Sequence, residues 1–194
     1  MIRYVVTVSL FGFYLFIFWV LGSGISKPRP KLASLISLSF WGFAGGLVTI
    51  VVSGLFDVPF LIVGLKQLSS RLLAPIWEEM MKATVIFAFF AWNKLGSITQ
   101  INRDLMTLFG LVVGLSFAAI ENIGYINQYN IPLDVVVKRG FSTWDMHIVA
   151  AFLSSYGLKE SYNKKKIWIL PYLAVAILIH LVMNNGDIIL QFIS

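Results

Sequence analysis

Three of the four glutamates in this chain, and both of its histidines, lie within long apolar segments. They come from four separate segments: Glu78 and Glu79 from the first, Glu121 from the second, His147 from the third and His180 from the fourth. The purely apolar run beside the first pair, residues 83–92, is about 15 Å long as a helix, roughly half of a bilayer's hydrocarbon thickness. A helix that crosses there must carry charges into the membrane. Ionisable groups in a membrane cost about a few kcal/mol each, so these residues indicate a function.

The residue types are those of hydrolysis by an activated water. A carboxylate can act as a general base on water, and a second acid or an imidazole can orient that water. His180 and Asn184 are four residues apart, so they share a helical face and can donate hydrogen bonds to a developing oxyanion. The sequence contains no His-Glu-x-x-His motif, and no serine is paired with a histidine at a recognisable spacing. A divalent metal held by His147, His180 and a glutamate is chemically open, but no spacing demands a cofactor.

Each of these groups also has a purely structural explanation. The acids after Pro75 could begin a helix, with Lys82 paired to Glu78 one turn later. Glu121 and Asn122 could lie among the lipid headgroups. A lone histidine in a membrane often forms a hydrogen bond between helices, and the polar stripe of the last segment could do the same. These explanations are independent of one another, so none predicts a common position for the groups.

The composition excludes most soluble classes. The chain is 58% hydrophobic and 12% charged with a mean hydropathy of +0.84, whereas a soluble domain is about a quarter charged. The net charge of +6 comes from basic residues in short gaps between apolar runs, with no basic face interleaved with aromatics, so we expect no nucleic-acid partner. The lipid bilayer is the expected surrounding. The absence of cysteine excludes disulfides.

The apolar segments predict an all-α, polytopic bundle in a single integral membrane domain, 1–194, with the candidate site residues in the core 72–190. The six expected spans cover residues 4–21, 32–56, 72–92, 105–126, 140–158 and 167–190. Residues 57–71 contain too short an apolar stretch to span, which favours an interfacial or re-entrant helix. Gly42 and Gly46 have the spacing that allows two helices to approach closely.

The candidate residues share one depth in this arrangement. Glu78, Glu121, His147 and Asn184 are each about five or six residues inside the boundary of a span, roughly 8–9 Å at 1.5 Å per residue. His180 lies one turn deeper. Because successive spans run in opposite directions, all of these residues fall on one side of the membrane. A common level on four helices favours a shared site over four unrelated structural roles.

The gaps between the spans differ in charge between the two sides of the membrane. The side away from the site holds nine basic residues, including those of segment 27–31, and the other side holds five. The positive-inside rule then places both termini outside the cytoplasm and the site toward the extracytoplasmic side. The thirteen-residue segment 127–139 is expected to be a loop on the site's side that could gate substrate access.

The motifs resemble those of the PrsW family of intramembrane proteases, with the CAAX prenyl-protease and bacteriocin-immunity group and the scaffold subunit of gamma-secretase as distant relatives. The matching elements, in order, are Glu78-Glu79-x-x-Lys82, Phe117-Ala118-x-x-Glu121-Asn122, His147 and His180-x-x-x-Asn184. The CAAX pattern would have an arginine at Ala83 and a histidine at Glu121. Both departures favour the PrsW branch.

The resemblance implies a protease that cleaves a membrane-tethered protein, such as an anti-sigma factor, in or near the membrane. By motif position it also implies a role for each residue: Glu78 as the base, Glu79 and Lys82 as its support, Glu121 and His147 as the rest of the water site, and His180 and Asn184 as oxyanion donors, with Asn122 in support.

The sequence leaves three alternative functions open. The first is a non-catalytic scaffold or immunity-type protein on the same fold. The second is a CAAX-type prenyl-protein protease, which would need its site on the cytoplasmic side. The third is a proton-coupled transporter, which predicts an inverted repeat that the sequence does not show.

Overall fold

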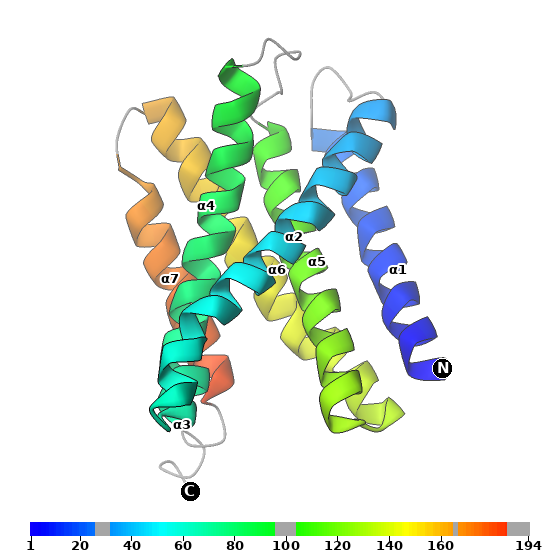
Figure 1. Ribbon diagram of the computed structural model, residues 1–194. Coiled ribbons are helices and arrows are strands. Elements are labelled where there is room, and N and C mark those ends of the chain that lie inside the picture. Colours follow the sequence, from blue (N-terminus) through cyan, green and yellow to red (C-terminus); the bar gives the residue numbers. More distant parts are fainter. Residues whose placement is uncertain (26–31, 96–103, 165–166, 186–194) are drawn as a thin grey trace, which may run out of the picture.

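The computed structural model describes residues 1–25, 32–95, 104–164 and 167–185, and every regular element within them is helical. The elements are α1 (Ile2–Ile25), α2 (Leu32–Ile62), α3 (Lys66–Leu68), a π-helical turn (Ser69–Leu73), α4 (Ala74–Leu95), α5 (Asp104–Tyr129), α6 (Leu133–Lys164) and α7 (Ile169–Asn184). The six long helices alternate in direction and form one bundle (Figure 1). The predicted all-α class is confirmed. The basic segment 27–31 lies outside the described residues.

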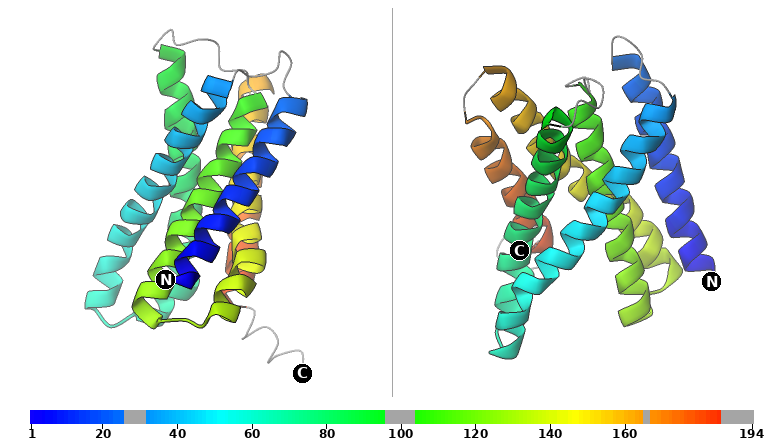
Figure 2. Two further views of the ribbon diagram at one scale, coloured as in Figure 1. Left: turned by 90° about the vertical axis from the view of Figure 1, so that its right-hand side faces the viewer. Right: turned by 45° about the horizontal axis from the view of Figure 1, so that its top comes forward.

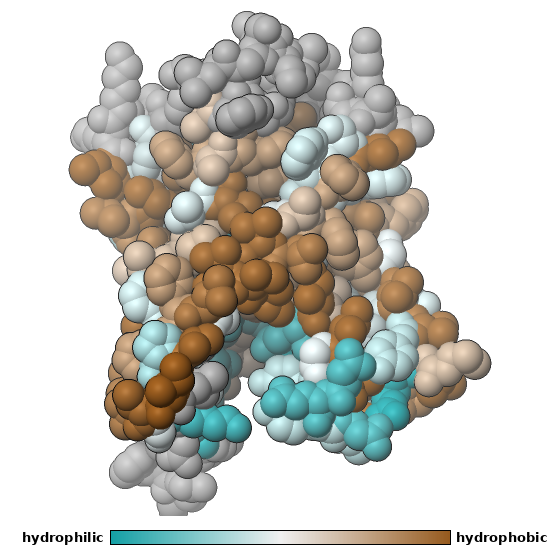
Figure 3. Space-filling model, in the orientation of Figure 1, coloured by the Kyte–Doolittle hydropathy of each residue, from teal (hydrophilic) through white to brown (hydrophobic). Residues whose placement is uncertain are grey.

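The outer surface of the bundle suits a lipid surrounding. Three of the described helices contain stretches long and apolar enough to cross a membrane: Ile2–Leu21, Leu35–Phe60 and Leu105–Tyr129. Large apolar side chains such as Phe16, Phe40 and Phe87 are exposed. Hydrophobic residues cover the middle of the face shown in Figure 3, and hydrophilic ones gather toward the lower end of α5. A soluble protein rarely exposes so much apolar surface, and the chain is an integral membrane protein.

Helix α5 lies at the centre of the bundle. The apolar stretch of α5 is 72% buried, whereas that of α1 is 11% buried. The two views of Figure 2 show α5 flanked by α1 and α2, with α6 along another side. Its side chains Phe109, Val112 and Leu115 are almost completely buried, and Phe109 stacks on Phe89 of α4 with ring centroids 4.1 Å apart. Residues on α5 are therefore placed between four other helices.

Small residues allow α5 to approach its neighbours. A Cβ added at Gly42 or Gly46 of α2 would lie 2.5 or 2.7 Å from an α5 side chain, too close for an ordinary contact. The close approach predicted for these two glycines is confirmed. On the other side of α5, a Cβ at Gly114 would lie 2.5 Å from the backbone oxygen of His147 on α6. Glycine at this position brings the backbone that carries His147 against α5.

The segment 57–71 differs from its prediction. A short helix lies within it, Lys66–Leu68, but residues 57–62 belong to α2 and residues 69–71 to the π-helical turn. Helix α2 passes through Pro59, because a proline in an apolar helix removes one hydrogen bond without ending the helix. The chain turns at Gly64, whose φ of 77° suits glycine. The short helix then leads through the π-helical turn directly into α4.

The predicted loop 127–139 is wrong. Helix α5 continues to Tyr129 and α6 begins at Leu133, so three residues connect them. Asn130 adopts a φ of 48°, a conformation that asparagine tolerates, and Pro132 accepts a hydrogen bond from the amide of Val136 as the first turn of α6 forms. A proline that begins a helix was interpreted as a loop residue. No segment of this length is left there to act as a gating loop.

Candidate active site

Helix α4 supplies the charged centre of the site. Glu79 and Lys82 are three residues apart on its inner face, and both side chains are fully buried. The ammonium of Lys82 donates to Glu79 Oε1 over 2.6 Å. The sequence allowed a pair between Lys82 and Glu78, but the structure pairs Lys82 with Glu79. Two opposite charges side by side make the burial of each tolerable.

His147 of α6 connects this pair to α5. The Lys82 ammonium lies 3.0 Å from His147 Nδ1, and His147 Nε2 lies 3.0 Å from Glu121 Oε2. An ammonium can only donate, so Nδ1 accepts and Nε2 carries the proton that it donates to Glu121. The ring of Phe117 lies 4.3 Å from the Lys82 ammonium and covers it. The tautomer of His147 therefore follows from its two partners.

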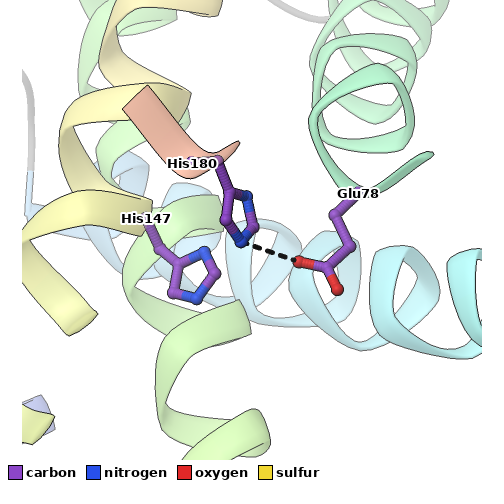
Figure 4. A group of neighbouring side chains, drawn as sticks. All are labelled: Glu78, His147 and His180. Carbon is purple, nitrogen blue, oxygen red and sulfur yellow. Dashed lines mark ion pairs between the residues drawn. The ribbon is translucent and has the colours of Figure 1, made fainter. Parts of the chain in front are cut away.

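His180 of α7 completes the centre. Its Nδ1 lies 2.8 Å from Glu79 Oε1, and its Nε2 lies 3.6 Å from Glu78 Oε2 (Figure 4). Because the Glu79 carboxylate accepts, Nδ1 carries the proton and the lone pair of Nε2 is directed toward Glu78. The His147 and His180 rings meet edge to face, with centroids 4.8 Å apart. One carboxylate of α4 thus orients His180, and the other faces its free nitrogen.

We call Glu79, Lys82, His147 and His180 the buried half of the site, since their side chains are at most 2% exposed. The remaining charged side chains form an exposed edge: Glu78, 17% exposed, Glu121, 23%, and Arg139, 20%. These three side chains are the partly exposed charges of the site.

Arg139 of α6 was not found by sequence reasoning. Its guanidinium donates to Glu121 Oε2 over 3.4 Å and to Asn122 Oδ1 over 3.3 Å, and it stacks on the ring of Tyr125, 3.8 Å from the centroid. Arg139 is the last residue of the predicted loop 127–139, so its place on α6 was not expected. A prediction that α5 and α6 form a tight hairpin would have brought Arg139 near Glu121, 18 residues away.

The two asparagines of the motifs have different positions. Asn122 is fully buried and donates to Thr7 of α1 over 3.1 Å. Asn184 is the last residue of α7 and its side chain is exposed, and the described residues contain no side-chain hydrogen bond to it. The neighbouring Asn185 instead donates to the backbone oxygen of Arg71 over 3.0 Å. The structure therefore brings together all the predicted site residues except Asn184.

A metal ion would find suitable donors here. Glu78, His147 and His180 each have one potential ligand atom, and these three atoms lie within 4.8 Å of one another. The set matches the two histidines and one glutamate that the sequence suggested as metal ligands. His180 needs no rearrangement, because Nε2 is free while Nδ1 donates to Glu79, a common support for a metal-binding histidine. His147 would have to exchange one of its two present partners.

The charge of the site also fits a cation. Three carboxylates, those of Glu78, Glu79 and Glu121, face the two cations Lys82 and Arg139. With both histidines neutral, one negative charge is left over in a partly dehydrated site. A bound cation or a proton would balance it.

Comparison with known proteins identifies a family for this chain. The model of the PrsW family, described as intramembrane metalloproteases, matches residues 30–191. A search of curated proteins and a search of solved structures gave no match. The matched region contains every residue of the buried half and of the exposed edge, and it begins after α1. The chain belongs to the PrsW family of intramembrane metalloproteases.

Proposed function

We propose that Glu78 is the general base that activates water for peptide-bond hydrolysis. The position of Glu78 supports this role, because Glu78 lies at the exposed edge and its Oε2 is 3.6 Å from the free Nε2 of His180. This separation is too long for a hydrogen bond, but both atoms can bind the same water molecule. Glu79 is buried and already engaged by Lys82 and His180, so it is poorly placed to receive a proton.

The proposed reaction uses one water and one peptide bond. Glu78 accepts a proton from the water as the water oxygen bonds to the carbonyl carbon. The proton passes to the amide nitrogen as the carbon–nitrogen bond breaks, which leaves a carboxyl and an amine. Glu121 holds His147, and Glu79 holds His180, in fixed orientations beside this water. Asn184 can donate to the oxyanion only of a substrate that lies across the end of α7.

A divalent ion would be held by Glu78, His147 and His180, where it would supply a Lewis acid that polarises the scissile carbonyl. Glu79 already orients His180 for this role by a hydrogen bond, whereas His147 would have to release Lys82 or Glu121 to bind the ion.

The proposed substrate is a membrane-tethered protein, such as an anti-sigma factor. We propose six spans, with the site toward the extracytoplasmic side. The alternating direction of the long helices in Figure 1 supports the spans, and the excess of basic residues in the first, third and fifth gaps of the sequence supports the orientation. A substrate on that side would present its cleavage site at the level of Glu78, His147 and His180.

The test is cleavage of a single-span substrate by the purified full chain in detergent. Glu78→Gln is expected to reduce cleavage by about 10³-fold or more at unchanged yield of folded protein. Glu160→Gln is the matched control, because it changes the one glutamate that lies outside the site, toward the far end of α6.

Assays with and without a chelator test the ion separately. Loss of cleavage with chelator and its return with added zinc would support the ion at Glu78, His147 and His180. If Glu78→Ala, Glu121→Ala and His180→Ala all leave cleavage intact, the catalytic assignment is wrong.

A further inference from the structure

Helix α1 lies outside the matched family region, and its sequence contains no motif, but its first turns contact the site's polar surroundings. Arg3 donates to the backbone oxygen of Ile131 over 2.7 Å, in the connection between α5 and α6. Tyr4 donates to the side chain of Asn127 near the end of α5. These contacts hold the start of α1 against the α5–α6 hairpin, next to the exposed edge.

Thr7 is the innermost of these α1 residues. Its side chain is 1% exposed, and its hydroxyl donates to the backbone oxygen of Arg3 over 3.0 Å. With its single proton used in this way, the hydroxyl oxygen accepts from Asn122 Nδ2 over 3.1 Å. The Thr7 hydroxyl is the partner that the structure gives to the amide group of this fully buried asparagine.

Two contacts, one with Thr7 and one with Arg139, hold the Asn122 amide in one orientation. With Nδ2 directed at Thr7, Oδ1 is directed at Arg139 and accepts from its Nε over 3.3 Å. A reversed amide would place two donors, Nδ2 and Arg139, against each other. The guanidinium, which can only donate, therefore excludes the reversed orientation, and the Thr7 hydroxyl satisfies the Nδ2 that this leaves facing α1.

The same arrangement continues to the centre of the site. Arg139, held by Asn122 and by the Tyr125 ring, donates to Glu121 Oε2, and that oxygen also accepts from His147 Nε2 over 3.0 Å. His147 in turn accepts from Lys82 over 3.0 Å. An unbroken series of hydrogen bonds thus runs from α1 to α4.

We propose that Thr7 is a positioning residue for cleavage: through Asn122 and Arg139, α1 fixes the orientation of Glu121 and His147. This inference rests on the proposed function, because cleavage is its readout. If Thr7 has this role, α1 contributes to cleavage, although the region matched by the family model begins after α1. Thr7 acts through other residues and does not contact the substrate.

The experiment compares Thr7→Val with Thr49→Val in the full chain, by measuring kcat and KM for a single-span substrate in detergent. Both threonines are fully buried or nearly so, but among the described residues the Thr49 hydroxyl bonds only to its own helix, at Gly45 O over 2.9 Å. Thr7→Val is expected to lower kcat by up to about tenfold with KM within about twofold, because it frees the Asn122 amide that holds Arg139 beside Glu121, the direct partner of His147. Thr7→Ser keeps the hydroxyl and is expected to restore kcat.

A double-mutant cycle adds Asn122→Ala. If Thr7 acts through Asn122, the double variant is no slower than the slower single variant. Multiplied losses would overturn the inference, as would equal kcat values for Thr7→Val and Thr49→Val, or a Thr7→Ser variant as slow as Thr7→Val.

The same variants distinguish a loss of folded protein from a loss of catalytic rate. All rates are expressed per protein in the monodisperse size-exclusion peak. If Thr7→Val gives no such peak, Thr7→Ala and its control Thr49→Ala replace the valine pair in the same comparison. Absence of cleavage by the wild-type chain would contradict the proposed function itself. Wild-type cleavage that Glu78→Gln abolishes and Thr7→Val leaves unchanged would contradict only the role of α1.

Discussion

The buried half of the site and its exposed edge contain the same kinds of groups in different surroundings. In the buried half, Lys82 and Glu79 are 2.6 Å apart with no exposed surface. At the edge, Arg139 and Glu121 are 3.4 Å apart and about a fifth of each side chain is exposed. A buried charge has no water to stabilise it and depends on its partner, whereas an edge charge keeps solvent on one side. The buried half should therefore determine whether the site forms, and the edge how it reacts.

The largest expected effect is on stability, from Lys82→Met. This change leaves Glu79 as an uncompensated buried charge, so we expect a loss of about 3–5 kcal/mol in the free energy of unfolding. Unfolding of the purified protein in detergent measures it. The control is Lys138→Met, which breaks a pair with Asp134 whose side chains are 79% and 66% exposed, and which should leave stability unchanged. Equal stability of the two variants would contradict the division into halves.

Glu121→Gln tests the edge. Glutamine keeps the shape and a hydrogen-bond acceptor for His147 but removes the charge, so we expect folded protein with cleavage reduced by about 10²-fold. Asp134→Asn, an exposed carboxylate one turn before Lys138, is the matched control and should cleave normally. Both melting temperature and cleavage rate are measured. A Glu121→Gln protein that unfolds like Lys82→Met would mean that the edge also holds the site together.

Gly114→Ala tests the close contact between the backbones of α5 and α6 beside His147. Alanine at Gly114 would place its Cβ 2.5 Å from the backbone oxygen of His147, so we expect a loss of about 1–3 kcal/mol and slower cleavage as α6 is displaced. Gly124 lies on the same helix with nothing within 4 Å of an added Cβ. Gly124→Ala should be neutral or more stable by about 0.5–1 kcal/mol, because alanine favours helix. Thermal unfolding of the pair in detergent distinguishes them, and similar losses would contradict the close α5–α6 contact.

The smallest expected effect is from Tyr14→Phe on α1. It removes a hydrogen bond of 2.8 Å to the exposed Asp145 of α6, which should cost about 1 kcal/mol or less. Cleavage should be unchanged, because Asp145 has no hydrogen bond to the site among the described residues. A reduced rate in the standard cleavage assay would show that α1 acts through general packing on α6 rather than through Thr7.

Much of the site was predictable because an ionisable residue in an apolar segment is conspicuous. Glu78, Glu121, His147 and His180 were found in this way, and the structure places them together. The partner of Lys82 was not predictable, because residues three and four positions away share its helical face and Glu79 and Glu78 satisfy either spacing.

Other features could not be found from local sequence. Arg139 was assigned to a loop because a proline that begins a helix has the same appearance in a sequence as one that interrupts it. Thr7 lies 115 residues from Asn122, and a hydroxyl in an apolar run has no spacing rule that would connect the two. The choice between Asn184 and Asn185 depends on where α7 ends, and such boundaries are the least certain part of any sequence prediction.

The three-residue connection between α5 and α6 has a consequence for the newly made chain. Glu79 and Lys82 are three residues apart on one helix, and Arg139 meets Glu121 across the hairpin after 18 residues. Each of these pairs of opposite charges can therefore enter the membrane already neutralised, as a single helix or a helical hairpin during synthesis. His180 reaches Glu79 across 101 residues and is made last. Because we propose that His180 shares a water with Glu78, we expect a chain that has not yet inserted α7 to leave its substrate uncleaved.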